Sequence, residues 1–266
     1  MSILKLKDCK LHYKKEGSGD IIILLHGLSD DINYWNPLNN YFKKKYTVIR
    51  VDLRGHGKST YKKGTINNYE LQNDIYELMK HLNINKATFI GFSLGGIISM
   101  NFTLKHPEMV EKLILMSTFA KIDENNKAIH KTIYKEVEKG LGNFYDTMIP
   151  FVLPEYLIKE NKELIEYGRT KCLEKNQKAI SETIKAYCQI NIENEIKTIK
   201  QDTLIIGGSE DDKLAPYNMI IKLYEEIKNS QILFLKNTKH NILLNENLEK
   251  ICGIIDIFLK EVWIIK

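Results

Sequence analysis

One short segment, Ile-Gly-Phe-Ser-Leu-Gly-Gly at residues 90–96, constrains the fold more than any other part of this 266-residue chain. It lies between an apolar run at 87–90 and a helix-like pattern that begins at residue 97. A Gly-x-Ser-x-Gly segment at a sharp strand-to-helix turn holds its serine in a strained backbone conformation, with the hydroxyl exposed. Glycines at 91 and 95 suit that turn because strand and helix crowd the positions two before and two after the serine. The segment therefore predicts a nucleophile at Ser93, against the alternative of a tight turn without chemistry.

Strands and helices alternate on both sides of this segment. Nearly continuous apolar runs indicate strands buried on both faces, and helical patterns separate them. Such alternation is typical of a mostly parallel, doubly wound sheet in an α/β protein. We expect strands at 9–14, 21–25, 46–52, 87–90, 112–117, 203–206 and 231–235, and helices at about 67–82, after Ser93, up to about 228 and at 248–260.

The alternation pauses between residues 120 and 200. This stretch is helical in composition, rich in mixed charge and supplied with aromatic residues. We interpret it as an inserted helical cap, or lid, over a core made of residues 1–119 and 201–266. The alternative is a set of ordinary core helices with long loops.

Composition narrows the class of protein further. The chain is 43% hydrophobic and 27% charged, as in an ordinary soluble domain, and its 39 basic and 34 acidic residues are interspersed. The sequence has no stripe of basic residues of the kind that binds phosphate backbones, so no nucleic-acid partner is predicted. The four cysteines are scattered, and neither a signal-peptide core nor a membrane-length apolar run occurs. These observations predict a cytoplasmic protein with free thiols.

A serine hydroxyl needs an imidazole to take its proton and a carboxylate to hold that imidazole. In a sheet of this kind the order along the chain is Ser, then Asp or Glu, then His, each after a strand. Asp211 and Asp212 both follow the strand at 203–206, and His240 follows the strand at 231–235. Ser93, one of these aspartates and His240 therefore form a candidate catalytic triad.

With these residues the chain resembles serine hydrolases of the α/β-hydrolase fold, within the group of capped esterases, lipases and enol-lactonases. The resemblance covers nearly the whole chain except the cap. It depends on His26-Gly27, on residues 52–59, 91–96 and 212–216, and on His240. It implies an esterase-type hydrolase that cleaves a carboxylic ester, thioester or lactone of a small, apolar substrate through an acyl-enzyme.

Two spacings disagree about the acid. Family members usually carry Gly-x-x-Asp-x-x-x-Pro, and here the distance to Pro216 selects Asp212 whereas the distance from Gly208 selects Asp211. The segment thus holds one extra residue. We favour Asp212, because the residues after it resemble the family more closely, and keep Asp211 as the alternative acid.

The backbone N–H groups of Leu28 and Leu94 are the candidate oxyanion hole, since Leu28 follows His26-Gly27 and Leu94 begins a helix. We expect His26 to be structural and to hold its loop. Histidines and carboxylates lack metal-ligand spacing, and no phosphate-binding loop occurs, so no metal or other cofactor is expected.

The predicted partner is thus a small ester-type molecule. Two alternatives stay open: a signalling or receptor-type protein with slow turnover, and carbon–carbon hydrolase or haloperoxidase-like chemistry on the same triad. The sequence does not indicate the oligomeric state.

Overall fold

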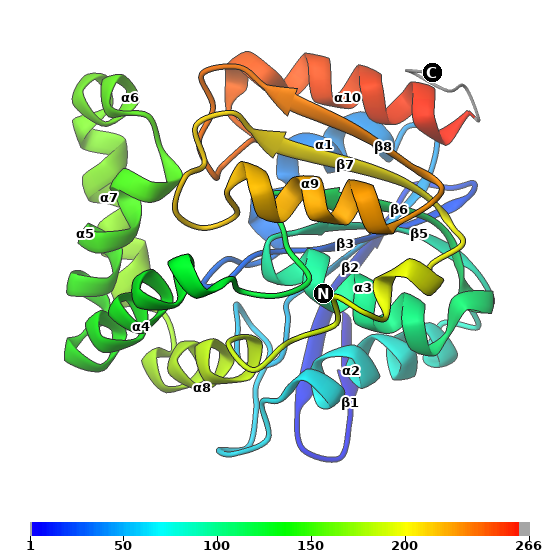
Figure 1. Ribbon diagram of the computed structural model, residues 1–266. Helices are drawn as coiled ribbons and strands as arrows, with labels where there is room; N and C mark the ends of the chain where they lie inside the picture. Colours follow the sequence, from blue (N-terminus) through cyan, green and yellow to red (C-terminus); the bar gives the residue numbers. More distant parts are fainter. Residues whose placement is uncertain (1, 261–266) are drawn as a thin grey trace.

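The structure is a computed structural model that describes residues 2–260, and its centre is an eight-stranded sheet (Figure 1). The strand order is β1-β2-β4-β3-β5-β6-β7-β8, and every neighbouring pair from β4 to β8 is parallel. The pairs β1–β2 and β2–β4 are antiparallel. The predicted mostly parallel sheet is therefore confirmed. The strands are β1 (Ser2–Lys5), β2 (Lys10–Glu16), β3 (Ile21–Leu25), β4 (Thr47–Val51), β5 (Ala87–Phe92), β6 (Val110–Met116), β7 (Asp202–Gly208) and β8 (Ser230–Leu235).

Helices cover both faces of this sheet (Figure 1). On one face α1 (Asn36–Phe42) and α10 (Asn245–Leu259) bury Trp35, Phe42 and Phe258 against the strands. On the other face lie α2 (Asn68–His81), α3 (Leu94–Lys105) and α9 (Tyr217–Glu226). Short 3-10 helices occur at Ile32–Trp35, Pro107–Met109 and Ile196–Thr198.

The order in which successive strands join the sheet reverses at β3, and this positions the site. Strand β4 pairs with one edge of β3 and β5 with the other, so the loops after β3 and β5 diverge from a common edge. Ligands of such sheets bind where neighbouring connections diverge at the carboxyl ends of the strands. Ser93 directly follows β5 and His26 directly follows β3, so both stand at this edge.

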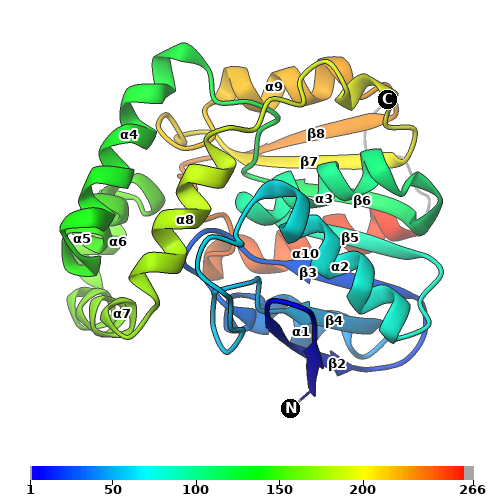
Figure 2. The same ribbon diagram turned by 90° about the horizontal axis from the view of Figure 1, so that it is seen from below.

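Five helices between β6 and β7 form a separate layer at that same edge (Figure 2). We call them the helical insertion: α4 (Glu124–Lys139), α5 (Leu141–Val152), α6 (Glu155–Glu160), α7 (Lys162–Leu173) and α8 (Gln177–Tyr187). They lie inside the expected cap segment, 120–200. The division into a core of 1–119 and 201–266 and a cap stays a prediction, and residues 1 and 261–266 of that core are outside the described part of the chain.

Among residues 2–260 no helix is both long and apolar enough to cross a bilayer.

Candidate active site

Ser93 stands between β5 and α3 with φ of 50° and ψ of −113°. A positive φ is uncommon for a residue with a side chain, and the observed strain matches the strained turn expected at this serine. Two hydrogen bonds fix the turn from the next strand: Ser93 N–H donates to the Met116 carbonyl at 2.9 Å, and Thr118 Oγ1 donates to the Ser93 carbonyl at 2.7 Å.

The glycines around the serine are required by close packing. A Cβ atom at Gly91 would overlap the backbone of Gly95 and Gly96, and one at Gly95 would overlap the Leu25 carbonyl oxygen. A Cβ atom at Gly96 would lie 2.7 Å from the Thr118 side chain. The crowding expected on both sides of Ser93 is thus present.

His240 Nδ1 lies 2.6 Å from Asp211 Oδ2, and both side chains are buried. The Asp211 carboxylate also accepts hydrogen bonds from the backbone N–H groups of Leu214 at 3.1 Å and Ala215 at 3.2 Å. Burial by itself would raise the pKa of Asp211, but the charge of His240, its hydrogen bond and the two backbone donors together lower it.

Asp212, the aspartate that the sequence favoured, does not reach His240. Its side chain is 65% exposed and pairs with Lys213 at 2.6 Å, whereas the Asp211 side chain is fully buried. The preference for Asp212 as the carboxylate beside His240 is therefore wrong. Counting back from Pro216 failed because the extra residue lies after the acid, between Asp211 and the proline.

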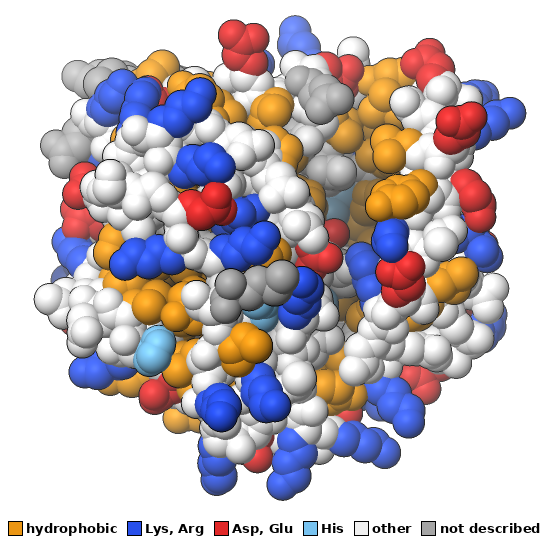
Figure 3. All heavy atoms as spheres, turned by 180° about the vertical axis from the view of Figure 1, so that it is seen from behind, with side chains coloured by type: hydrophobic (Ala, Val, Ile, Leu, Met, Phe, Trp, Pro, Cys, Tyr) orange, Lys and Arg blue, Asp and Glu red, His pale blue; other side chains and the backbone are white. Residues whose placement is uncertain are grey.

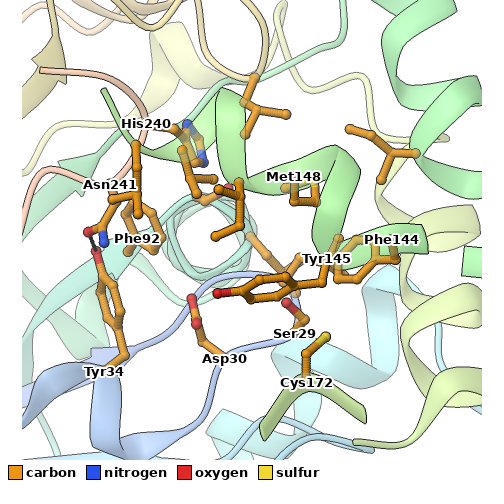
Figure 4. A pocket seen from close by; sticks show the side chains of 18 of the residues that line it. Ser29, Asp30, Tyr34, Phe92, Phe144, Tyr145, Met148, Cys172, His240 and Asn241 are labelled. Atoms are coloured by element: carbon orange, nitrogen blue, oxygen red, sulfur yellow. Dashed lines mark hydrogen bonds between the residues drawn. The ribbon is translucent and has the colours of Figure 1, made fainter. Parts of the chain in front are cut away.

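Aromatic packing positions the imidazole. The Phe92 ring lies 5.2 Å from the His240 ring and stacks on Tyr34 at 4.6 Å. The Tyr34 hydroxyl donates to Asn241 Oδ1 at 3.4 Å, which connects the loop after β3 to the histidine loop (Figure 4). Since Phe92 is the residue before Ser93, the strand that carries the serine also supports the histidine.

His26 has no free nitrogen for proton transfer. Its Nδ1 lies 2.8 Å from the Gly27 carbonyl, and its Nε2 accepts from the Leu53 N–H at 3.0 Å. Burial, the largest cause, holds the pKa of His26 well below its usual range. The neutral ring therefore joins the loops after β3 and β4, as expected for a structural residue.

A cavity of about 240 Å³ joins these groups. Ser93, His240, Leu28 and Leu94 all line it. Leu94 is the first residue of α3, where the backbone N–H has no partner inside the helix. The wall is mainly apolar and includes Phe119, Phe144, Met148, Ile149, Val152 and Leu214. In Figure 3 the surface is hollowed, and hydrophobic side chains gather beside the hollow.

Several hydrogen bonds attach the helical insertion to the loops of the site, among them one from the Asn241 N–H to the Val152 carbonyl at 3.1 Å. Asn126 of α4 donates to the Lys213 carbonyl at 2.7 Å, in the loop that holds Asp211. Lys239 donates to the Pro150 carbonyl at 2.7 Å, beside His240. Lys175 donates to the Ser29 carbonyl in the loop after β3. These bonds connect the insertion directly to the loops that carry the site residues.

Two histidines have partners that the sequence analysis did not find. His130 of α4 lines the cavity, its Nδ1 lies 3.0 Å from the Tyr187 hydroxyl, and burial lowers its pKa to about 4. His12 Nδ1 lies 2.7 Å from Asp52 Oδ2 in a buried pair. No spacing along the chain signalled either contact, because each joins elements that are distant in sequence.

Comparison with known proteins agrees with this architecture. A family model described as alpha/beta hydrolase fold matches residues 20–149. The crystal structure of the enol-lactonase from Burkholderia xenovorans is 22% identical, covers 97% of this chain and 100% of its own, and superposes with a TM-score of 0.90. The chain therefore has the alpha/beta hydrolase fold, as its sequence resemblance implied.

Two of the sequence relatives are named as hydrolases that act on different bonds. The 3-oxoadipate enol-lactonase 2 of Acinetobacter baylyi is 27% identical over 78% of each chain. A putative carbamate hydrolase of Agrobacterium fabrum, RutD, is 23% identical over 89% of this chain and 92% of its own. This similarity supports a hydrolase, while the bond that is cleaved differs among the relatives.

Proposed function

We propose that the protein is a serine hydrolase that cleaves a carboxylic ester, or the internal ester of a lactone, through an acyl-enzyme. The observation that carries the proposal is the buried His240–Asp211 pair at 2.6 Å, whose histidine lines the same cavity as the strained Ser93. A hydroxyl, an imidazole and a carboxylate are the groups that acyl transfer through serine requires.

Each group has a distinct part in the proposed reaction. Ser93 Oγ attacks the carbonyl carbon while His240 takes its proton and then delivers it to the leaving alcohol. Asp211 holds the imidazole in one tautomer and stabilises its protonated form. The backbone N–H groups of Leu28 and Leu94 stabilise the oxyanion, a contribution typically worth about 3 kcal/mol for each donor. The acyl-enzyme is then hydrolysed by water through the same steps.

The helical insertion is proposed to act as a cap that supplies the apolar wall of the substrate pocket. Its residues Phe144, Met148 and Val152 line the cavity, and burying the acyl chain there is favourable by about 0.8 kcal/mol per methylene group. Substrates with an apolar chain of several carbons should therefore react faster than acetate. The free cysteines at 9, 172, 188 and 252 support the further proposal of a cytoplasmic location.

The name of the Acinetobacter relative makes lactones the second substrate class to test, because a lactone has the same carbonyl chemistry as an open ester. The test is a panel of p-nitrophenyl esters from acetate to octanoate, with simple lactones added. We expect turnover by the wild-type protein and loss of at least about 10³-fold with Ser93→Ala. Equal turnover by wild type and Ser93→Ala would overturn the proposal.

A further inference from the structure

Asp30 places a carboxyl group in the mainly apolar cavity. It lies two residues after Leu28 in the loop that follows β3, and its side chain points into the cavity beside Tyr34 and Ser29 (Figure 4). The side chain is only partly exposed. A carboxyl group in such a wall loses hydration, so it is unfavourable unless a partner compensates.

The other buried aspartates have that compensation within the protein. Asp52 accepts from the Ile32 and Lys58 backbone N–H groups and contacts His12, and Asp74 binds the Arg54 guanidinium at 2.6 and 2.8 Å. Among residues 2–260, no hydrogen bond reaches the Asp30 carboxyl group. Its acceptor oxygens therefore remain available to a molecule in the cavity.

Nearby charged groups influence the Asp30 carboxyl group. Burial is the largest influence and raises its pKa to about 6; Lys175 of the helical insertion and His240 act in the opposite direction, and Asp31 acts in the same direction. The Lys175 amine is already bound to the Ser29 carbonyl. The group is thus ionised at pH 7 and above, inside the site where we propose ester hydrolysis.

We propose that Asp30 is a specificity-determining residue, which accepts a hydrogen bond from an ammonium or hydroxyl group on the substrate. The inference depends on the proposed hydrolase function and names its substrate class: esters with a mainly apolar chain that carries one hydrogen-bond donor. A substrate with a carboxylate at the same position would face the charge of Asp30 and be disfavoured.

The kinetic test uses p-nitrophenyl esters whose acyl chains of four to eight carbons end in a methyl, an ammonium, a hydroxyl or a carboxylate group. For each chain length, kcat/KM of the ammonium ester is divided by kcat/KM of the methyl ester. The readout is the largest of these ratios. A hydrogen bond to a charged group predicts that Asp30→Asn lowers this ratio by about tenfold or more. Asp30→Leu should lower it similarly and improve the methyl esters.

Asp31→Asn is the matched control. It removes the same charge one residue away, outside the walls of the catalytic cavity, where the Asp31 side chain accepts the Asn33 N–H at 2.7 Å and caps a short helix. Asparagine caps helices equally well, so the ratio should stay within about twofold. An equal change in Asp30→Asn and Asp31→Asn would overturn the inference.

The dependence on pH supplies an independent readout. A change that affects the reaction of both esters of a pair equally cancels in the ratio. The ratio for the wild-type protein should rise between pH 5 and pH 7 as Asp30 ionises, and it should be flat for Asp30→Asn. A ratio that does not change with pH in the wild-type protein contradicts the inference.

A binding measurement separates this inference from the hydrolase proposal. Calorimetric titration of Ser93→Ala with hexylammonium, hexanol and hexanoate needs no turnover. We expect hexylammonium to bind more tightly than hexanoate, and this order to be lost with Asp30→Asn in the same background. Tighter binding of hexanoate would overturn the role of Asp30 even if Ser93 hydrolyses esters. If the wild-type protein hydrolyses no ester but the ligands bind in the expected order, only the proposed hydrolase reaction is overturned.

Discussion

Replacing Asp211 by asparagine is the most demanding test of the candidate site. Every oxygen of this carboxylate faces a donor: Oδ1 faces the Leu214 N–H at 3.1 Å, while Oδ2 faces the Ala215 N–H at 3.2 Å and His240 Nδ1 at 2.6 Å. Asparagine turns one of these oxygens into an NH₂ group. Either orientation of the amide therefore places two donors against each other.

The magnitude follows from this geometry. A buried donor left without an acceptor costs about 1–3 kcal/mol, so the free energy of unfolding should fall by that amount. Loss of the negative charge and of the fixed tautomer should lower kcat by about 10³- to 10⁴-fold, which corresponds to about 4–5 kcal/mol in the activation barrier. The large effect should thus be kinetic, in a protein that still folds.

The matched control is Asp212→Asn. This aspartate is exposed and pairs only with Lys213, and such surface pairs contribute about 0–1 kcal/mol. We expect kcat within about twofold of wild type. Steady-state rates on a p-nitrophenyl ester measure kcat, and thermal unfolding measures the stability. The rate of labelling by a phosphonate measures the reactivity of Ser93. If Asp212→Asn abolishes turnover while Asp211→Asn retains it, our assignment of the acid is refuted.

Three further predictions concern stability. Gly95→Ala should lower the free energy of unfolding by about 3 kcal/mol or more, because the new Cβ overlaps the Leu25 carbonyl. Gly253→Ala in α10 meets no atom within 4 Å and should raise the free energy of unfolding by about 0.5–1 kcal/mol, and urea unfolding compares the two variants. The pKa of Asp211 is lowered below its ordinary value of 3.8, so the ionised carboxylate stabilises the folded protein fully above that pH and progressively less as the pH falls below it. The difference in the free energy of unfolding between wild type and Asp211→Asn should therefore shrink from pH 7 to pH 3. His26→Ala removes two buried hydrogen bonds and should cost about 2–4 kcal/mol in thermal unfolding; an unchanged melting temperature would contradict its structural role.

The serine turn could be predicted from sequence because its requirements are local. Gly91 and Gly95 are dictated by atoms within a few residues of Ser93 and by the strand beside it, so the pattern of glycines carries the geometry. The sheet was predictable for a similar reason: strands such as Ile21–Leu25 are apolar along their whole length, since both faces are covered.

The acid could not be chosen in the same way. Asp211 and Asp212 differ in which one turns inward, and that depends on the backbone path of the loop after β7. Only the structure shows the Leu214 and Ala215 N–H groups, three and four residues on, converging on Asp211. The local sequence held one signal: the residue four positions after Asp211 is Ala215, which has a backbone N–H, whereas the residue four positions after Asp212 is Pro216, which has none.

A histidine–aspartate pair by itself does not define an active site in this protein. The pairs His12–Asp52 and His240–Asp211 have nearly equal separations, 2.7 and 2.6 Å, and all four side chains are buried. They differ in what surrounds them. Within the described residues, Nε2 of His12 is enclosed without a partner, and Asp52 is bound by the loop N–H groups that it connects. His240 instead borders the cavity that also contains the strained Ser93. The His12 pair therefore has the structural role of joining loops, and access to a nucleophile is what makes the His240 pair a candidate for catalysis.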